Sequence, residues 1–431
     1  MKEEQTQNKI ESLLQPSKEK LILVIAILGM WAILGLLFIF YGYIPTWRLW
    51  MIPALSPFFF DFRLIPGMVQ TLRMGLDPTV TNPGDPIGRI FNYPRIWYLL
   101  AYTNLSQSDT LWVGILLIIL FFVAVMLFPG KLKKLDILLM MLVLFSPAAM
   151  LLYERANVDL FIFFLCALAV AVSEAAVIMS VVIVLFAAVL KLFPFFGMGM
   201  FLFKEKRVFL WLLIPSTIVF IFYLLVTSHN VQASWSLTQR GNDISYGANV
   251  VVAHFKHDIR FISKQWITDK ASIPTIFSNI SYAAALLIAL VSLWIGLQAR
   301  QRLTTLSQRN LNAFWMGGAI YVGTFLLGNN WDYRLAFLVL IVPQVSEWIH
   351  QSTGRQRGAM ILTMSLIVVS CWYMMYSSFV TEAYRDYSFI FDELVDWSLF
   401  AALAYLLAAS VPEWFRLLFT TRPKFLVRNS S

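Results

Sequence analysis

The run LILVIAILGMWAILGLLFIFYGY occupies residues 21–43 and contains no charged side chain. About 20 apolar residues of α-helix are needed to cross the hydrocarbon core of a bilayer. The run is longer than a signal-peptide core, and no obvious small-x-small cleavage site accompanies it. We therefore read residues 21–43 as a retained membrane anchor and expect the rest of the chain to be organised around it.

The composition supports this interpretation. The chain is 59% hydrophobic and only 13% charged, whereas a soluble domain is about half apolar and a quarter charged. Its repeated apolar runs have helical rather than strand lengths, which predicts an all-α integral membrane protein rather than a barrel. The net charge of +9 is assigned to membrane orientation, and no nucleic-acid partner is expected. Cys166 and Cys371 lie inside apolar runs, so we expect core residues rather than a disulfide or metal-thiolate site.

Basic residues follow every second apolar run except at one tight turn, Ser173-Glu174, as the positive-inside rule requires. The sequence thus predicts a bundle of about twelve transmembrane helices with both termini in the cytoplasm. The division is a cytoplasmic tail (1–20), one polytopic catalytic domain (21–411) and a basic cytoplasmic tail (412–431). The predicted crossings are 21–43, 110–128, 136–152, 158–173, 175–190, 192–203, 208–227, 276–298, 311–327, 334–347, 358–378 and 396–411.

One predicted crossing is unusually short. Residues 192–203 reach about half a bilayer, and Pro194 with the Gly197-x-Gly199 pair predicts a broken or re-entrant helix there. The outer segments carry most of the acids. The first outer loop, 44–109, is expected to contain interfacial helices around 58–74 and 88–104, and a second large outer loop covers 228–275. This imbalance places the functional surface at the extracytoplasmic face.

The chain has no phosphate-binding glycine loop, His-Glu-x-x-His motif, nucleophile elbow or zinc spacing. The strongest candidate is Asp61 in the run Phe58-Phe59-Phe60-Asp61-Phe62-Arg63, where an acid and a base lie among aromatic residues at a membrane surface. A partly desolvated carboxylate is suited to act as a general base. The alternative is an Asp61–Arg63 ion pair that anchors an interfacial helix.

A second polar cluster is Tyr153-Glu154-Arg155-Ala156-Asn157-Val158-Asp159. Arg155 is suited to bind phosphate with two hydrogen bonds, and Asn157 to bind a sugar; the alternative is a helix cap with a Glu154–Arg155 bridge. Lys191 would neutralise a lipid phosphate or else extend to the interface.

Polar residues of two later segments complete the candidate set. Asp332 and Arg334 are suited to pair with one another, either in a site or in a turn. Arg240 and Tyr246 lie in a loop suited to substrate contact. His254 and His257 have no third ligand nearby in the sequence, so no metal site is assigned.

The layout resembles the GT-C superfamily of polytopic glycosyltransferases, and is most similar to the bacterial polyprenol-phosphate-mannose-dependent type, family 87. The resemblance covers residues 20–200 and 320–340. The matching residues are Asp61, Asn92-Tyr93-Pro94, Glu154-Arg155-Ala156-Asn157-Val158-Asp159, Lys191-Leu192-Phe193-Pro194 and Asn330-Trp331-Asp332-Tyr333-Arg334.

The resemblance implies a polyprenyl-phosphate sugar donor and an acid in the first outer loop that serves as base or metal ligand. Two neighbouring acids are frequent there in the superfamily, but this chain has Asp61-Phe62-Arg63. A base without a divalent metal is therefore favoured, and no cofactor is expected. The absence of a soluble domain after the last predicted crossing argues against an oligosaccharyltransferase-like role.

We therefore expect an inverting glycosyltransferase of the cell membrane, with the bacterial inner membrane favoured, that acts on a glycan or glycolipid acceptor. The predicted roles are: Asp61 as catalytic base; Arg63, Arg155, Lys191 and Arg334 for the donor phosphate; Glu154, Asn157, Asp159, Arg240, Tyr246 and Asp332 for substrate. One alternative is an O-antigen-type polymerase, ranked second because its paired Arg-rich outer loops are not found. The other is a lipid-linked-sugar flippase, which would place ionisable groups inside the membrane; nearly all charges here are predicted at the ends of crossings.

Overall fold

The computed structural model of the chain describes residues 17–228, 231–232, 243–255, 273–299, 303 and 305–420. Within these residues the chain is almost entirely helical. One sheet is present among them, an antiparallel pair of β1 (Ser245–Tyr246) and β2 (Asn330–Trp331). The predicted all-α class is therefore confirmed.

Four helices in the described part of the chain are long and apolar enough to cross a membrane. They are α2 (Lys18–Tyr41), α5 (Thr110–Leu127) with the short η2 (Gln107–Asp109) before it, α10 (Lys206–Val226) and α14 (Ile273–Leu297). Two bent pairs raise the number to six if each is one crossing. The twelve predicted crossings stay a prediction.

The first bent pair joins α6 (Lys134–Leu144) to α7 (Pro147–Arg155) at an angle of 55°. Ser146 caps α7, because its hydroxyl accepts from the Ala149 amide at 3.3 Å, and proline is well suited to the first position of a helix. A new helix therefore starts inside the predicted crossing 136–152. This break points the end of α7 towards the first loop.

Three shorter apolar helices follow: α8 (Asp159–Val172), α9 (Val177–Leu190) and the 3-10 helix η3 (Phe193–Phe203). The predicted break at 192–203 thus corresponds to a 3-10 helix. η3 packs on α15 (Gln308–Leu326), and a Cβ atom on Gly197 would overlap the Met316 side chain. Small residues allow two helix backbones to approach closely.

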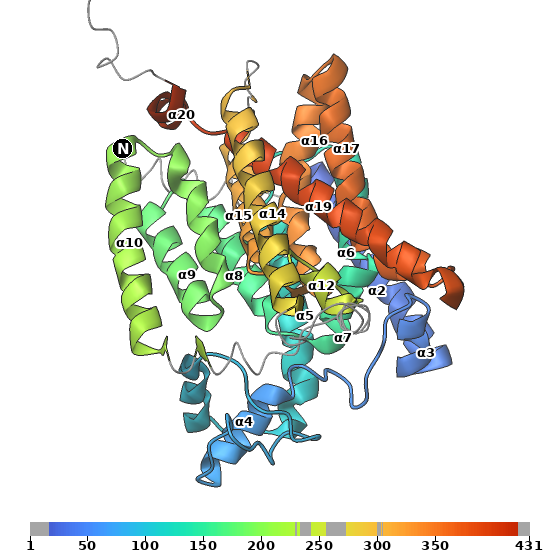
Figure 1. Cartoon of the computed structure of the whole chain (residues 1–431). Coiled ribbons are helices and arrows are strands. Elements are labelled where there is room, and N and C mark those ends of the chain that lie inside the picture. The colour runs from blue at the N-terminus through green and yellow to red at the C-terminus, as the bar shows by residue number, and fades with distance from the viewer. Residues whose placement is uncertain are drawn as a thin grey trace, which may run out of the picture.

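The first loop contains three short helical segments before η2, namely α3 (Tyr43–Arg48), α4 (Leu64–Arg73) and η1 (Arg95–Tyr102). The last two fall inside the predicted helices 58–74 and 88–104 but are shorter. Figure 1 shows α4 at one end of the molecule and α20 (Glu413–Thr420) at the opposite end. Of the predicted tails, residues 1–16 and 421–431 lie outside the described residues.

The remaining helices are α12 (Val250–His254), η4 (Asp332–Leu340), α16 (Val342–Gln351), α17 (Gly354–Cys371), α18 (Tyr373–Ser377), η5 (Glu382–Tyr384) and α19 (Arg385–Ala409). The second bent pair joins η5 and α19 to α20 at 104°. α19 begins well before the predicted crossing 396–411. Three acids of its first half, Asp392, Glu393 and Asp396, are buried in protein.

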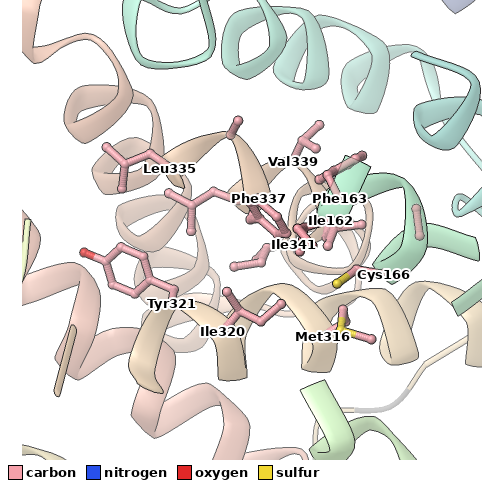
Figure 2. Packing of buried hydrophobic residues seen from close by; sticks show 14 of the residues in the cluster. Ile162, Phe163, Cys166, Met316, Ile320, Tyr321, Leu335, Phe337, Val339 and Ile341 are labelled. Atoms are coloured by element: carbon pink, nitrogen blue, oxygen red, sulfur yellow. The ribbon is translucent and has the colours of Figure 1, made fainter. Parts of the chain in front are cut away.

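The core forms where α8, α15 and η4 meet. Figure 2 shows Phe163 and Cys166 of α8 near Met316 and Ile320 of α15, with Phe337 of η4 beside Phe163. Both cysteines are fully buried and free, as predicted for core residues. Burial of η4 fixes the position of Arg334 near its start.

Candidate functional site

A cavity of about 510 Å³ lies where the first loop meets the α7–α8 turn, the start of η3 and the β2–η4 segment. One part of its wall is apolar, with Leu55, Leu64, Leu151, Leu192, Phe193 and Leu327. The other part carries polar and charged groups: Asp61, Arg89, Asn92, Tyr93, Arg155, Asn157, Lys191, Asn329, Asn330 and Arg334. The cavity therefore gathers side chains from regions far apart in the sequence.

Asp61 is the one carboxylate among the described residues that line this cavity. The Phe62 amide donates to the Arg155 carbonyl at 3.3 Å and ties the first loop to the end of α7. Ala156 then adopts a left-handed conformation (φ 43°) that reverses the chain into α8. As a result the Asn157 side-chain amide donates to Asp61 Oδ2 at 2.8 Å.

The basic partner of Asp61 is Arg89, with Nη1 3.8 Å from Asp61 Oδ1. Arg89 is fixed by the buried Asp85, which accepts from Nη2 at 2.7 Å and from Nε at 3.1 Å. It also donates to the Phe60 carbonyl at 2.7 Å. Sequence reasoning missed Arg89 because it follows a turn-rich stretch; the Asp85–Arg89 spacing of four residues was the available signal.

The Arg63 side chain lies outside the cavity. Its Nε donates to the Phe58 carbonyl at 2.9 Å and its Nη1 to Gln107 at 3.3 Å, and it does not line the cavity. The alternative of an Asp61–Arg63 ion pair is therefore wrong: Asp61 pairs with Arg89. Arg63 holds the first loop together.

Asp159 is fully buried beside the cavity and binds two of its cations. Its carboxylate lies 2.5 Å from Lys191 Nζ and 3.2 Å from Arg334 Nε. Lys191 also donates to the Asn157 side-chain oxygen at 3.2 Å. The expected pairing of Arg334 with Asp332 is thus replaced by pairing with Asp159.

Glu154 and Arg155 form the predicted bridge, with Arg155 Nε 3.0 Å from Glu154 Oε2. Glu154 is buried and accepts from the Leu55 amide at 2.9 Å. Arg155 also donates to the Pro53 carbonyl at 2.9 Å. It nevertheless lines the cavity, so the bridge orients a cation at the wall.

Aromatic rings lie close to two of the cations that line the cavity. Lys191 Nζ lies 5.2 Å from the centre of the Tyr93 ring, and the Arg334 guanidinium lies 4.6 Å from that of Phe193. Burial, followed by the charge of Asp61, raises the pKa of Tyr93, so its hydroxyl stays protonated. The rings therefore present an electron-rich face to the cations.

Of the predicted substrate residues that the structure describes, Asn157 lines the cavity, whereas Glu154, Asp159, Tyr246 and Asp332 do not. The Tyr246 hydroxyl is 2.9 Å from the Thr324 hydroxyl, and its ring stacks on Tyr321. Asp332 is buried and does not line the cavity, although its neighbours Trp331 and Tyr333 do. Arg240 and His257 lie outside the described residues.

Comparison of the chain with protein-family models, with curated proteins and with solved structures found no match. Among the described residues, no group of three or more His, Cys, Asp or Glu side chains is arranged to hold a metal ion. The chemistry of the cavity is therefore argued from its own residues. It presents one carboxylate as proton acceptor, four cations for an anionic group, and amides and the phenols of Tyr93 and Tyr333 for hydroxyl groups.

Proposed function

We propose that this cavity is the active site of a membrane glycosyltransferase. It would move a sugar from a polyprenyl-phosphate donor to a lipid-linked or envelope glycan acceptor at the extracytoplasmic face. The observation that supports this most is that Asp61, the one carboxylate among the described lining residues, shares the cavity with Arg89, Arg155, Lys191 and Arg334. A proton acceptor opposite several cations suits an anionic leaving group.

The proposed reaction inverts the anomeric carbon. Asp61 accepts the proton of the acceptor hydroxyl while the acceptor oxygen forms a bond to that carbon. The bond from the anomeric carbon to the phosphate oxygen breaks, and the polyprenyl phosphate leaves with its negative charge. Asn157 holds Asp61 from one side through a 2.8 Å hydrogen bond.

The charge balance favours a donor with one phosphate. Four acids match the four cations of the cavity in number. The cations are Arg89, Arg155, Lys191 and Arg334, and the acids paired with them are Asp61, Asp85, Glu154 and Asp159. A phosphodiester donor adds a single negative charge to this balanced set. A diphosphate would add more charge to a partly desolvated cavity, where uncompensated charge is costly.

The apolar wall supports a lipid substrate. Leu55, Leu64, Leu151 and Leu192 line the same cavity as the charged groups. A headgroup would lie against the cations while the first part of its isoprenoid chain contacts these side chains. The superfamily assignment, the twelve crossings and the extracytoplasmic orientation belong to this proposal.

A second candidate function is a lipid-linked-sugar flippase. Ionisable residues inside a membrane-spanning helix are expensive and commonly functional. The acids Asp392, Glu393 and Asp396 are buried in α19 and would lie inside the membrane if α19 crosses it. They are the observation that favours transport.

The test uses purified protein in lipid nanodiscs with a panel of polyprenyl-phosphate sugars and acceptors, read by mass spectrometry of the lipids. Asp61→Asn should lower transfer by roughly 10²-fold or more, the usual contribution of a general base. Asp77→Asn is the matched control, since Asp77 is an exposed acid of the same loop outside the cavity.

Full activity of Asp61→Asn would reject Asp61 as the base. Movement of a lipid-linked sugar across vesicles without bond formation would support the flippase instead.

A further inference from the structure

The first half of α19 carries three acids that face the protein interior. Asp392, Glu393 and Asp396 are 2%, 3% and 1% exposed. Asp332, at the start of η4, is 2% exposed. Asp392, Glu393 and Asp396 lie within five consecutive residues of α19, and Asp392 and Asp396, four apart, share one face of the helix. The charge of Asp396 also reaches Asp332, and the four carboxyl groups are here called the acid cluster.

Hydroxyl groups satisfy only part of the acid cluster. Ser370 donates to Asp396 Oδ1 at 2.6 Å, and Tyr376 donates to Asp392 Oδ1 at 3.0 Å. Both carboxyl oxygens of Glu393 and Oδ1 of Asp332 are buried without a hydrogen-bond partner. The Trp397 indole lies near the Glu393 carboxyl group but does not form a hydrogen bond of normal geometry with it. Such buried polar atoms are rare and call for an explanation, such as a bound ion, an ordered water or a change of charge state.

No basic residue compensates the acid cluster within the part of the chain that the structure describes. No Lys or Arg forms an ion pair with any of its members there. His254 of α12, which packs on α19, is bound to Asp243 and to Asp386 at the start of α19. Arg334, two residues after Asp332 in η4, is paired with Asp159. α14 packs along α19 and contains no charged residue.

The other titratable neighbours are neutral groups. They are Tyr321 of α15, Cys371 of α17, and Tyr373 and Tyr376 of α18. Four ionised carboxylates would therefore face one another in a medium of low dielectric constant. Their repulsion and desolvation would cost far more than the folding of a domain provides.

We propose that the acid cluster is a proton-binding site that retains protons at neutral pH and titrates as a unit. Protonation turns an unpartnered carboxyl oxygen into a donor, so neighbouring carboxyl groups share protons, as closely spaced acids do elsewhere. None of the four carboxyl groups of the acid cluster lines the cavity, and the proposal does not depend on the proposed transferase. The acid cluster also gives the chain a proton-accepting group inside a helix of the membrane bundle.

The experiment is infrared spectroscopy of the full-length protein in nanodiscs, titrated from neutral to alkaline pH in water and in heavy water. Wild-type protein should show the carbonyl band of protonated carboxyl groups at neutral pH, shifted by deuterium and lost on alkaline titration. Glu393→Gln should remove part of that band. Glu382→Gln is the matched control, because the Glu382 side chain is 90% exposed just before the same helix.

Two results would overturn the proposal. One is a wild-type spectrum without a protonated carboxyl band at neutral pH. The other is a band that grows only when sodium, potassium or calcium ions are removed, which would identify the acid cluster as a metal-cation site. If Glu393→Gln does not fold, Asp332→Asn replaces it, and a band unchanged in the folded variant would also reject the assignment.

Discussion

The Asp159 carboxylate lies 2.5 Å from the Lys191 ammonium group, and Asp159 has no exposed surface. The same carboxylate reaches Arg334 at 3.2 Å. Two cations of the cavity, from segments more than a hundred residues apart, are thus positioned by one buried anion. Asp159 acts through these cations and does not itself line the cavity.

Removal of the Asp159 carboxylate should therefore lower the stability of the folded protein. Asp159→Ala leaves two cations without their partner, and breaking a buried ion pair typically costs about 3–5 kcal/mol. The expected result is a large loss of stability in thermal or denaturant unfolding in detergent. Arg385→Ala is the control, because its bridge to Glu382 is long (4.0 Å) and exposed, and such pairs contribute about 0–1 kcal/mol. Equal effects of the two variants would contradict this role for Asp159.

Arg89 and Arg63 should separate donor binding from loop stability. Arg89 lines the cavity, so Arg89→Gln should weaken binding of a polyprenyl-phosphate sugar by about 10-fold or more, the loss expected for a charge-assisted hydrogen bond. Arg63→Gln removes bonds to Phe58 and Gln107 and should mainly lower the unfolding temperature. Donor affinity of the folded protein, measured by titration, checks both. Weaker binding in Arg63→Gln alone would reverse these roles.

Asn157 should control the orientation of Asp61. It donates to Asp61 at 2.8 Å and accepts from Lys191 at 3.2 Å. Asn157→Ala removes a hydrogen bond to a charged group, which is worth about 1.5–3 kcal/mol. We expect kcat for transfer to fall about 10- to 100-fold with a smaller change in KM. An unchanged kcat would show that Asp61 is held without Asn157.

Much of the cavity could be predicted from the sequence because charges at the ends of apolar segments stand out. Asp61, Arg155, Asn157, Lys191 and Arg334 all line it. Their pairing could not be predicted, since it depends on how distant segments meet. Asp159, not Asp332, is the partner of Arg334.

The acid cluster was missed for a different reason. Asp392 and Glu393 precede the predicted crossing 396–411, and a hydropathy reading treats such acids as part of a loop. The structure extends α19 back to Arg385. The extent of this helix depends on the burial of one of its faces in the folded protein. Hydrophobic periodicity does not reveal that burial in so apolar a chain.

His254 should make stability depend on pH. Its hydrogen bond to Asp243 is the largest cause that raises the pKa of His254 above 6.5, and that bond also lowers the pKa of Asp243. A raised histidine pKa gives stability that is fully present below about pH 6.5 and is lost as pH rises through the folded-state value.

The measurement is the unfolding temperature against pH for wild type and His254→Phe, which retains an aromatic ring against Phe389. The difference between the two proteins should shrink as the pH rises above 6.5. A difference that stays constant across this range would show that the ion pair contributes nothing.

The contact of η3 with α15 gives the last prediction. A Cβ atom on Gly197 would overlap the Met316 sulfur, whereas one on Gly29 in α2 meets no atom within 4 Å. Gly197→Ala should therefore destabilise the protein by about 1–3 kcal/mol, as overpacking of a core does. Gly29→Ala should be neutral or slightly stabilising, because alanine favours a helix over glycine. Both are measured by unfolding in detergent. Because η3 begins two residues after Lys191, Gly197→Ala should also lower donor binding if displacement of η3 moves Lys191. Unchanged stability in Gly197→Ala would mean that Met316 moves aside and that the glycine is not required for this contact.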